Sequence, residues 1–419
     1  MSTRIRPFSV IFLVALLVLP GAASAWELRL TNNGNDQSYP SISGTNVVWQ
    51  DNRNGNWDIY LYDGATGQTR QLTNNTKDQK FPQIAGRYVV WEDYRNSQVQ
   101  RENPDIYLLD LQAGGEPVMV NFLDATFGGY ECSPAISDTD GVFVTWIEKA
   151  NGLSEQGRIF YRRIGDGTGP RQAYQDSNTQ TAPWISGQKL AWTDTDLGGV
   201  YFRNLADPEP RILERMSNET ITGIRSSGDR IIWSQFMAES MAYNLRLCQL
   251  DPDLQNGTKR WLSPSESFQS DPSIDGNLVV WSDDRNGIAD LYLYDLAANE
   301  ERPLVVADGQ QMQTSIDGEL VAFTDSRNGN NEIYLVSTAN TTPLPGVVAV
   351  QGGTGMPQDL NGDGRCEDVN GNGRADFADV VLYFNQMSWI AANEPILLFD
   401  YNGNGRIDFS DVTRLFSTL

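Results

Sequence analysis

Residues 40–73 read PSISGTNVVWQDNRNGNWDIYLYDGATGQTRQLT, and this stretch recurs with losses to about residue 337. Apolar and polar residues alternate in it over four short runs, which predicts four β-strands with Gly, Asn and Asp in the turns between them. Four short strands that repeat every 40–45 residues or so are typical of one blade of a β-propeller. We therefore expect an all-β fold for most of the chain.

One aromatic residue marks each repeat and sets the number of blades. Each ends an apolar run such as Val-Val-Trp, at spacings of 41 to 55 residues. We expect these residues to pack in the core between sheets and not to form a sugar-stacking platform, and their number predicts seven blades. They are Trp49, Trp91, Trp146, Trp192, Trp233, Trp281 and Phe323.

The two ends of the repeat region complement each other. The seventh unit stops after its third strand near Ser337, whereas LRLTNN at residues 28–33 matches RQLTNN at 70–75, the fourth strand of the first unit. We therefore expect the N-terminal segment to complete the last blade. A ring closed in this way has no unpaired edge strands at the join.

The clearest repeat is VVWSDDRNG at residues 279–287 followed by DLYLYD at 290–295, with close copies at 47–63 and 321–334. These residues resemble the TolB-like family of propeller repeats, which is related to the WD40-like type, and the likeness covers residues 26–337. It implies a seven-bladed propeller. Propellers of this type serve as binding platforms and as gating domains of peptidases, so the resemblance does not imply one function.

Composition excludes several classes of function. The chain has 419 residues and a formal charge of −23, which argues against nucleic acid or an anionic membrane as a partner. It has no histidine, so Ser-His-Asp and Cys-His nucleophiles and His-ligated zinc are excluded. Cys132, Cys248 and Cys366 lie far apart and are expected to be unpaired or semi-buried thiols.

Residues 1–25 have the features of a secretory signal peptide. Arg4 and Arg6 precede the apolar run 10–19, and Ala-Ser-Ala at 23–25 is a cleavage site before Trp26. The apolar run is too short for a stable membrane span, although an uncleaved anchor is the alternative. We expect a secreted or cell-surface protein without a transmembrane segment after cleavage.

After an uncharged Thr-, Pro- and Gly-rich linker at 338–357, residues 358–419 contain two matching 12-residue loops, DVNGNGRADFAD at 368–379 and DYNGNGRIDFSD at 400–411. Oxygen ligands at positions 1, 3, 5, 9 and 12 with Gly at position 6 form the EF-hand calcium pattern. Both loops are expected to bind Ca²⁺, with Arg374 and Arg406 supplying main-chain oxygens, and folding of this tail is expected to depend on the ion. The predicted ligands are Asp368, Asn370, Asn372, Arg374, Asp376 and Asp379 in the first loop, and Asp400, Asn402, Asn404, Arg406, Asp408 and Asp411 in the second.

A helix is expected after each loop, at 377–384 and 409–416, with Phe, Val and Leu at 3–4 spacing so that the two helices can bury apolar faces on each other. Upstream, a third pattern overlaps the first loop. It is either an extra calcium site or a solvated acidic turn, and its residues are Asp359, Asn361, Asp363 and Glu367.

The paired D-x-N-x-N-G-x-x-D-x-x-D loops resemble a type I dockerin, the small calcium module that docks onto cohesin domains. The likeness covers residues 358–419 and implies a small α-helical domain with a protein partner, either cohesin-like or a surface-layer protein. The loops lie 32 residues apart with SWIAANEP inserted, and Phe377-Ala378 and Phe409-Ser410 stand where the family often has small polar residues. A known cohesin specificity is therefore not expected to transfer.

Two sets of polar residues recur in the propeller repeats. Asp-x-Arg-Asn-Gly turns in four repeats are expected to be structural ion pairs and Asx turns, at Asp51/Arg53, Asp93/Arg95, Asp283/Arg285 and Asp325/Arg327. Polar residues near the start of each innermost strand are expected to ring one mouth of the central channel. They either bond to the backbone of their loop or form a funnel for a ligand or cation, and they are Gln37, Gln79, Glu131, Gln180, Gln269 and Gln311.

Irregular loops are where a unique function is expected. Candidate partner surfaces, for a protein or a glycan at the propeller face, are 94–104, 121–131, 148–157 and 235–244. Phe236, Met237, Met241 and Tyr243 give the last loop an apolar character, and they either contact a protein or fold back on the propeller.

Two hypotheses follow. The favoured one is an exported non-catalytic propeller scaffold, tethered through its calcium module to a cohesin-type or other surface partner. The alternative is a polysaccharide-degrading enzyme, a glycoside hydrolase or lyase, that carries a dockerin. Without histidine its chemistry needs carboxylates, and the acids considered are Glu131, Glu148, Asp194 and Glu239.

Overall fold

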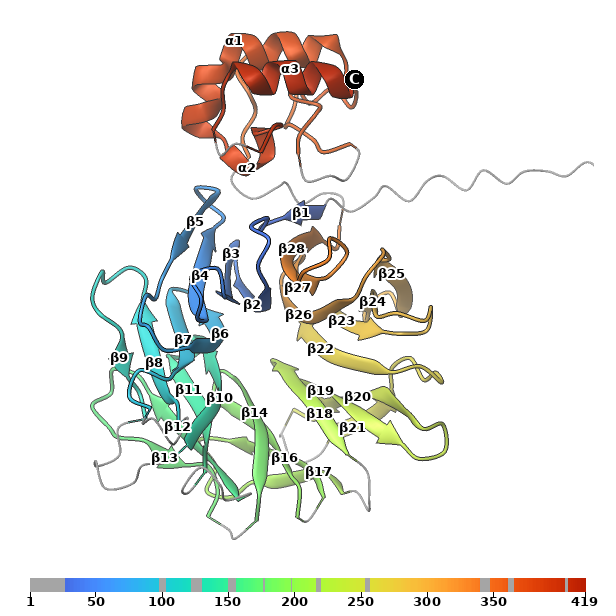
Figure 1. Ribbon diagram of the computed structural model, residues 1–419. Coiled ribbons are helices and arrows are strands. Elements are labelled where there is room, and N and C mark those ends of the chain that lie inside the picture. Colours follow the sequence, from blue (N-terminus) through green and yellow to red (C-terminus); the bar gives the residue numbers. More distant parts are fainter. Residues whose placement is uncertain are drawn as a thin grey trace, which may run out of the picture.

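The computed structural model describes residues 27–97, 103–121, 130–149, 156–175, 178–196, 198–215, 220–252, 257–339, 347–360, 365–403 and 406–419. Its strands form seven four-stranded antiparallel sheets arranged around a central axis (Figure 1). Each sheet is one blade, and consecutive strands run from the innermost to the outermost position. The predicted seven-bladed propeller is confirmed.

Each blade takes its strands from one repeat, except that the last is completed by β1. The bounds, blade by blade, are β2 (Gln37–Ser43), β3 (Asn46–Asp51), β4 (Asp58–Asp63), β5 (Gln68–Gln71); β6 (Gln79–Ala85), β7 (Tyr88–Asp93), β8 (Asp105–Asp110), β9 (Val118–Met119); β10 (Tyr130–Ser137), β11 (Phe143–Lys149), β12 (Gly157–Arg163), β13 (Arg171–Gln172); β14 (Gln180–Ser186), β15 (Lys189–Asp194), β16 (Gly199–Asn204), β17 (Arg211–Arg215); β18 (Ile221–Ser227), β19 (Arg230–Met237), β20 (Ala242–Leu250), β21 (Gly257–Trp261); β22 (Gln269–Asp275), β23 (Leu278–Asp283), β24 (Asp290–Asp295), β25 (Glu300–Val305); and β26 (Gln311–Asp317), β27 (Leu320–Asp325), β28 (Glu332–Ser337), β1 (Glu27–Arg29).

The ring is closed by its own first strand, as predicted. β1 pairs antiparallel with β28, with Leu28 opposite Leu335, and both side chains are fully buried. One further bond, from Leu30 N to Ile333 O at 2.8 Å, extends the pairing. The last blade thus has the same four strands as the others, and both chain segments at the join lose their open edges.

The predicted core aromatics are confirmed. All seven are fully buried, and most stack on an aromatic ring of the third strand, as Trp49 does on Tyr60 with ring centroids 6.3 Å apart. In several blades the indole N–H donates to an Asp two residues later, for example from Trp91 to Asp93 at 2.9 Å. In these blades the aromatic ring fills the space between sheets while its N–H is satisfied, whereas the indole nitrogens of Trp146 and Trp192 are buried without a partner.

Every innermost strand carries a bulge opposite this aromatic residue. Tyr39 and Pro40, for example, both lie opposite Trp49, because the register shifts between Ser38 and Ser41. A bulged residue needs no ladder N–H, which explains why proline recurs there. The preceding residue has a φ between 49° and 61° in each blade: Tyr39, Phe81, Ser133, Ala182, Gly223, Asp271 and Gln313. Because the conformation recurs in all seven blades, it belongs to the scaffold.

Side chains at the ends of the innermost strands tie each blade to the next. Gly86 N donates to Ser43 Oγ at 2.9 Å, and Gly318 N donates to Asp275 Oδ2 at 2.9 Å. The same bond crosses the join of the ring, from Gly44 N to Asp317 Oδ2 at 2.7 Å. The closed ring is therefore bonded around its circumference as well as within each sheet.

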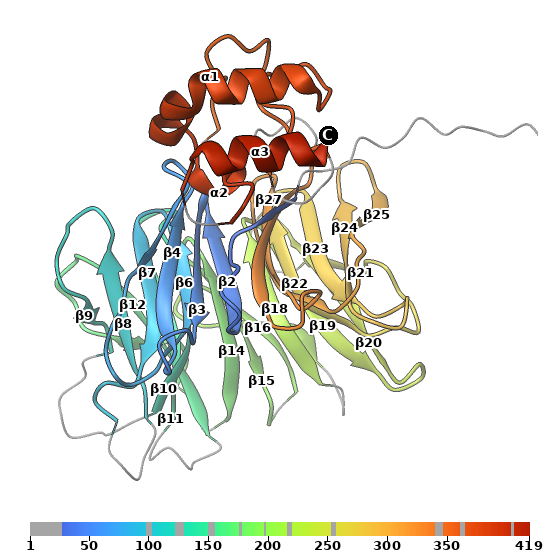
Figure 2. The same cartoon turned by 45° about the horizontal axis from the view of Figure 1, so that its top comes forward.

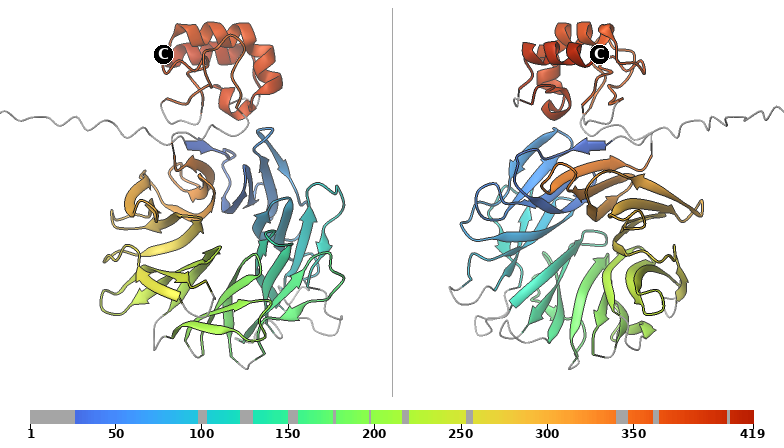
Figure 3. Two further views of the ribbon diagram at one scale, coloured as in Figure 1. Left: turned by 180° about the vertical axis from the view of Figure 1, so that it is seen from behind. Right: turned by 45° about the vertical axis from the view of Figure 1, so that its right-hand side comes forward.

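The C-terminal unit contains α1 (Phe377–Asn393), α2 (Ile396–Phe399) and α3 (Phe409–Thr418), and it lies beyond β1 and the β4–β5 hairpin at the rim of the ring (Figures 2 and 3). Val347 and Val350 are buried in one apolar cluster that includes residues of this unit and Leu28 and Tyr62 of the propeller. Val347 and Val350, which lie in the expected linker 338–357, are therefore part of the packed core.

Two further predictions can be compared with the described residues. All three cysteines are buried and unpaired, as expected. Within the part of the chain that the structure describes, no helix is both long and apolar enough to cross a membrane.

Leu28→Ala should destabilise the propeller, because it removes a fully buried side chain from the closing strand. The expected loss in free energy of unfolding is about 2–5 kcal/mol, measured by urea denaturation. Val118→Ala is the matched control, since Val118 is 56% exposed on an outermost strand. Equal effects of the two substitutions would show that the first strand does not close the ring.

Candidate functional site

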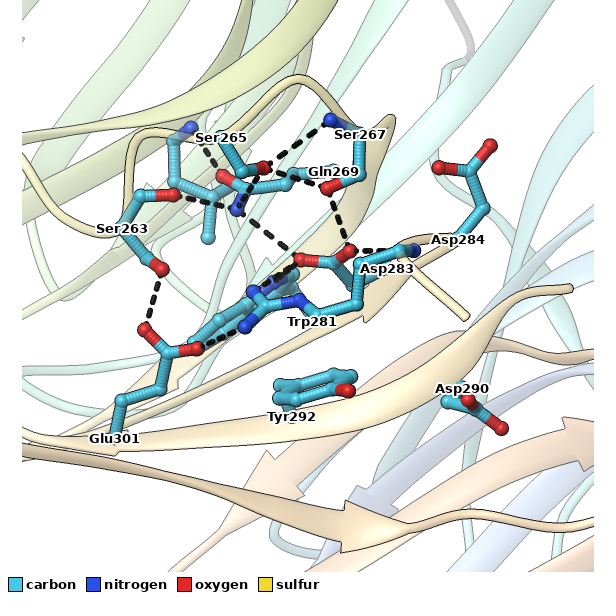
Figure 4. A network of polar contacts seen from close by, with 12 residues as sticks. Ser263, Ser265, Ser267, Gln269, Trp281, Asp283, Asp284, Asp290, Tyr292 and Glu301 are labelled. Atoms are coloured by element: carbon cyan, nitrogen blue, oxygen red, sulfur yellow. Dashed lines mark hydrogen bonds and ion pairs between the residues drawn. The ribbon is translucent and has the colours of Figure 1, made fainter. Parts of the chain in front are cut away.

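The Asp-x-Arg-Asn-Gly turns are structural ion pairs, as predicted. Figure 4 shows the example in the sixth blade, where Arg285 Nη2 lies 2.5 Å from Asp283 Oδ2 and Arg285 N donates to Asp283 Oδ1 at 3.0 Å. Burial acts to raise the pKa of Asp283, but hydrogen bonds from Arg285, Ser267 and Trp281 leave it below its usual value. The guanidinium also stacks on Tyr292, 3.9 Å from the ring centroid.

The same arrangement recurs in the first, second and seventh blades. Arg53, Arg95 and Arg327 each pair with an aspartate two residues before them and lie over a tyrosine of the third strand. A constellation that repeats in four blades and satisfies its own charges is a scaffold element. The structure gives no reason to assign it chemistry.

The glutamines expected at a channel mouth are buried inside the ring wall. Gln180 Oε1 accepts a bond from Ile159 N at 3.0 Å, and Gln269 Oε1 accepts one from Leu245 N at 3.0 Å, in each case from the preceding blade. All five glutamines, namely Gln37, Gln79, Gln180, Gln269 and Gln311, are fully buried. They therefore brace the loops and blades, and a ligand in the channel would not reach them.

Glu131 is the exception among these positions, because it brings a carboxyl group where five other blades have an amide. It lies directly opposite Glu148 in the β10–β11 ladder. Burial, together with the negative charges of Asp105 and Glu148, raises the pKa of Glu131 to about 8, and burial also raises the pKa of Glu148. Glu131 therefore carries a proton at neutral pH beside a second carboxyl group.

A third carboxyl group, Glu92, lies in the neighbouring second blade. Glu92 accepts bonds from Ser133 N at 2.8 Å and Tyr94 Oη at 3.1 Å. Burial raises its pKa to about 7. Sequence reasoning missed Glu92. At the same strand position three other blades have the uncharged residues Gln50, Ser282 and Thr324, so a comparison of the repeats would have shown the acid.

The remaining acids and loops considered from the sequence lie elsewhere in the propeller. Asp194 is buried and accepts a bond from Asn178 Nδ2 at 3.1 Å, and Glu239 lies exposed in the β19–β20 turn. In that hairpin Phe236 packs on Tyr243, with ring centroids 5.3 Å apart, while Met241 is exposed. Residues 98–102, 122–129 and 150–155 of the other predicted partner surfaces lie outside the described residues.

The described parts of the two C-terminal loops share their hydrogen bonds to the last-position aspartate. Asp368 accepts bonds from Asn372 N and Gly373 N at 3.0 and 2.6 Å, and Asp379 accepts from Asn370 N and Asp376 N at 2.9 and 2.8 Å. In the second loop Asp411 accepts from Asn402 N at 3.0 Å and Asp408 N at 2.8 Å, and Asp400 accepts from Gly403 N at 2.8 Å. The carboxylates at the first and last positions are therefore folded inward in both loops.

The donor set of the first loop fits a hard oxygen-seeking cation. Asp368 and Asp379 are fully buried, and Asn370 Oδ1 is a buried acceptor without a hydrogen-bond partner. Among the described residues no group of three or more Asp, Glu, Cys or His is close enough to hold a metal by itself. Amide and main-chain oxygens would therefore have to complete any site, as the EF-hand pattern requires.

Three of the predicted ligands cannot be placed. Asn404 of the second loop, and Asn361 and Asp363 of the third pattern, lie outside the described residues. Of the other members of that pattern, Glu367 accepts a bond from Leu360 N at 3.3 Å, and the Asp359 carboxylate acts electrostatically on Glu27 of β1. Calcium binding stays a prediction at all three places.

The prediction that the two helices bury apolar side chains on each other is right for their valine and leucine positions and wrong for their phenylalanines. α1 and α3 bury Val380, Val412 and Leu415 as expected, and α1 buries Tyr383 as well. Phe377, Phe384, Phe409 and Phe416, however, are 64%, 52%, 59% and 59% exposed. They form two edge-to-face pairs across the helices, Phe377 with Phe416 at 6.1 Å and Phe384 with Phe409 at 6.0 Å. We call these four residues the phenylalanine patch. Helical spacing alone could not show that they face outward.

The inserted residues also have a structural role. α1 continues to Asn393 and so includes most of SWIAANEP, which extends the helix by about two turns beyond the predicted end. Pro395 then lies against Gly67 of the β4–β5 turn. A Cβ atom at Gly67 would be 2.2 Å from Pro395 Cβ, so only glycine permits this contact between the unit and the propeller.

No family model matches the chain, and no curated protein matches it in sequence. Among solved structures, an oligogalacturonate lyase in complex with manganese is similar with a TM-score of 0.57 and 15% identity, covering 77% of this chain and 95% of that one. A puromycin-hydrolysing peptidase from Mycobacterium tuberculosis is similar with 0.56 and 17%, covering 73% and 52%. The propeller domain of the Trilobed protease from Pyrococcus furiosus, which has an open velcro topology, gives 0.54 and 12%, covering 73% and 94%. These identities support the fold and nothing finer.

Glu131→Gln should make the free energy of unfolding of the propeller less dependent on pH. Because the folded state raises the pKa of Glu131 from 4.5 to about 8, its contribution to stability is fully present below pH 4.5 and is lost as the pH rises through 8. The variant should therefore exceed the wild type in free energy of unfolding at pH 9, by a few kcal/mol in order of magnitude, and by less at pH 5.

Urea denaturation at the two pH values measures this difference. Glu300→Gln, an exposed glutamate on β25, is the control and should leave the pH dependence unchanged. A wild type and an E131Q variant with the same pH dependence would contradict the assigned protonation of Glu131.

Proposed function

We propose that the protein is an exported, non-catalytic propeller scaffold whose C-terminal unit attaches it to a protein partner in a calcium-dependent way. The observation that carries this proposal is the phenylalanine patch. Four phenylalanines more than half exposed on one small unit are unusual, and exposed aromatic groups of this kind mark protein contacts. The core of the C-terminal unit does not depend on the four phenylalanines, because other residues of α1 and α3 are the buried ones.

The loops support the calcium part of the proposal. Each loop precedes a helix that begins with a capping box, in which Asp376 or Asp408 caps the helix and Asp379 or Asp411 bonds back to the cap. Calcium at these loops would neutralise inward carboxylates and fix the starts of both helices. It would therefore hold the phenylalanine patch in one arrangement, which is how a dockerin-like module would become competent to bind.

The propeller supports the scaffold part of the proposal. Its repeated polar constellations satisfy themselves, as Figure 4 shows for the sixth blade. A partner at the phenylalanine patch would leave most of the ring free to present other surfaces. An apolar cluster shared by the unit and blades one and seven would transmit the attachment rigidly.

Calcium should raise the unfolding temperature of the full-length protein, and EGTA should reverse the change. Asp368→Asn should weaken the effect, because it removes one charge from an inward-facing ligand position. Asp166→Asn, an exposed turn aspartate whose bonds an amide can keep, is the control. Differential scanning calorimetry with and without calcium measures this, and a tail indifferent to calcium would refute the proposal.

Replacing Phe384 and Phe409 by serine should abolish partner binding by the full-length protein without changing its unfolding temperature in calcium. The binding assay is calorimetric titration against a panel of purified cohesin domains and surface-layer proteins, in calcium and in EGTA. Phe268→Ser is the matched control, because Phe268 is 48% exposed but lies on the propeller. Binding that survives the double substitution would exclude the phenylalanine patch as the contact.

A second candidate, a glycan-cleaving enzyme, is favoured by one observation, the facing pair Glu131 and Glu148. One protonated and one neighbouring carboxyl group are the parts that glycan cleavage uses. Incubation of the full-length protein with oligogalacturonate and other polysaccharides tests it, with Glu148→Gln as the inactive variant and Glu300→Gln as the control. Turnover that is lost only in E148Q would replace the scaffold proposal with this one.

A further inference from the structure

The channel through the ring is lined by the innermost strands, and one apolar position recurs along them. The next-to-last residue is isoleucine in six blades, and these side chains form a collar. A cavity of about 520 Å³ lies on the side of the glycine turns, and one of about 90 Å³ lies on the other side. The collar residues are Ile42, Ile84, Ile136, Ile185, Ile274 and Ile316.

The fifth blade breaks this pattern at two consecutive residues. Ser226 stands where the others have isoleucine, and its Oγ is buried without a hydrogen-bond partner. Arg225 stands where three other blades have serine, at Ser41, Ser273 and Ser315. Of the described residues that line the smaller cavity, Arg225 is the one cation, and none is a carboxylate.

Arg225 is held in place but its charge is not neutralised by an ion pair. Its guanidinium carbon lies 4.2 Å from the centroid of the Trp184 ring, and Nη1 donates to Ile224 O at 2.8 Å. No carboxylate lies within ion-pair distance of it in the described part of the chain. Burial lowers the pKa of Arg225, and the more distant Asp271 partly offsets this.

The Arg225 side chain is partly buried, and in the described part of the chain one of its five N–H groups donates to a protein acceptor, so the others can bind an acceptor in the cavity. Arg53, Arg95, Arg285 and Arg327 stack on tyrosine rings and each has an aspartate partner. Arg246 and Arg260 also stack on rings without an ion pair among the described residues, but they do not line this cavity. Arg225 combines a stacked guanidinium, no ion pair and a place in the cavity wall, and this combination favours a carboxylate as the ligand.

We propose that Arg225 anchors a site for a small carboxylate inside the central channel. Its planar fork matches the two oxygens of a carboxylate, and Trp184 fixes the plane of the fork. Ser41, Ser273 and Ser315 accept backbone N–H bonds from the next blade, so each hydroxyl keeps a proton that it can donate into the cavity. A space of about 90 Å³ can admit a carboxylate with one or two carbon atoms. The isoleucine collar would contact those carbons.

The proposal concerns the propeller alone and stands whether or not the C-terminal unit binds calcium or a partner. It predicts an order of affinity rather than a single binder. Acetate should bind more tightly than chloride, because chloride uses only one point of the fork. It should also bind more tightly than inorganic phosphate, because phosphate carries more negative charge and four oxygens, whereas Arg225 is the one cation among the described residues of the cavity wall.

Isothermal titration of the full-length protein with sodium acetate, phosphate and chloride at constant ionic strength tests this. Arg225→Met should weaken acetate binding at least tenfold. Arg246→Met is the matched control and should leave it unchanged, because Arg246 also stacks on an indole, Trp261 at 4.6 Å, but does not line either channel cavity. Should R225M fail to fold, Arg225→Lys keeps the charge without the fork, and it should still weaken acetate binding severalfold.

Four results would overturn the proposal, and the first three concern the wild type and R225K. They are the absence of acetate binding by the wild type, an acetate affinity that is equal in R225K and the wild type, and a preference for phosphate over acetate. Loss of acetate binding in R246M as well would do the same, because it would show that the effect does not come from the channel.

Discussion

The pairing of β1 with β28 is the constraint on which the rest of this structure depends. Seven blades can share identical interfaces only if the last meets the first, and that meeting is made by a strand from the other end of the chain. Two hydrogen bonds cross the join, from Gly44 N to Asp317 Oδ2 and from Tyr39 N to Gln313 Oε1. They match the bonds that link other neighbouring blades around the ring. Without the closing strand these bonds would have to hold the join alone.

The closed ring explains why repetition and departure have different meanings here. A position that recurs around the ring, such as the bulge opposite each core aromatic, is set by the geometry of blade packing and carries no specificity. Where one blade has a different residue at such a position, the geometry of blade packing does not explain the change. Glu131 in place of glutamine and Arg225-Ser226 in place of Ser-Ile are departures of this kind. Glu131 brings a carboxyl group into a buried position, and Arg225 brings a cation to the wall of a channel cavity.

The sequence predicted the number of blades, their phase and the closing strand, because period-two alternation and one buried aromatic per repeat report burial directly. It could not predict where the repeated glutamines would point. A polar side chain at a strand end can point either into the channel or into the wall between blades. At Gln180 and Gln269 a backbone N–H of the preceding blade binds the side chain and holds it in the wall. At Gln37 and Gln79 even this bond is absent, since Thr31 and Thr73 take the N–H groups of Ile333 and Ile59.

In the helical unit the same limit appears in another form. Both helices have apolar residues on two faces, so spacing alone did not distinguish Val380 and Tyr383, which are buried, from Phe377 and Phe384, which are exposed. The facing of Glu131 and Glu148 was also out of reach, because it depends on the register of two strands joined by a loop. Chain pattern predicts burial well, but it predicts the direction of a single side chain poorly.

One consequence of the fold links the two parts of the chain. Leu28 of the closing strand and Val347, Val350 and Leu398 of the C-terminal unit belong to one buried cluster, and Pro395 contacts the turn at Gly67. The unit therefore packs over the place where the ring is joined. An ion that orders its loops would also support that join, since any loosening of the helices would expose apolar surface on β1. Tethering and ring closure would then be stabilised together, and a partner that binds the helices would stabilise the propeller it carries.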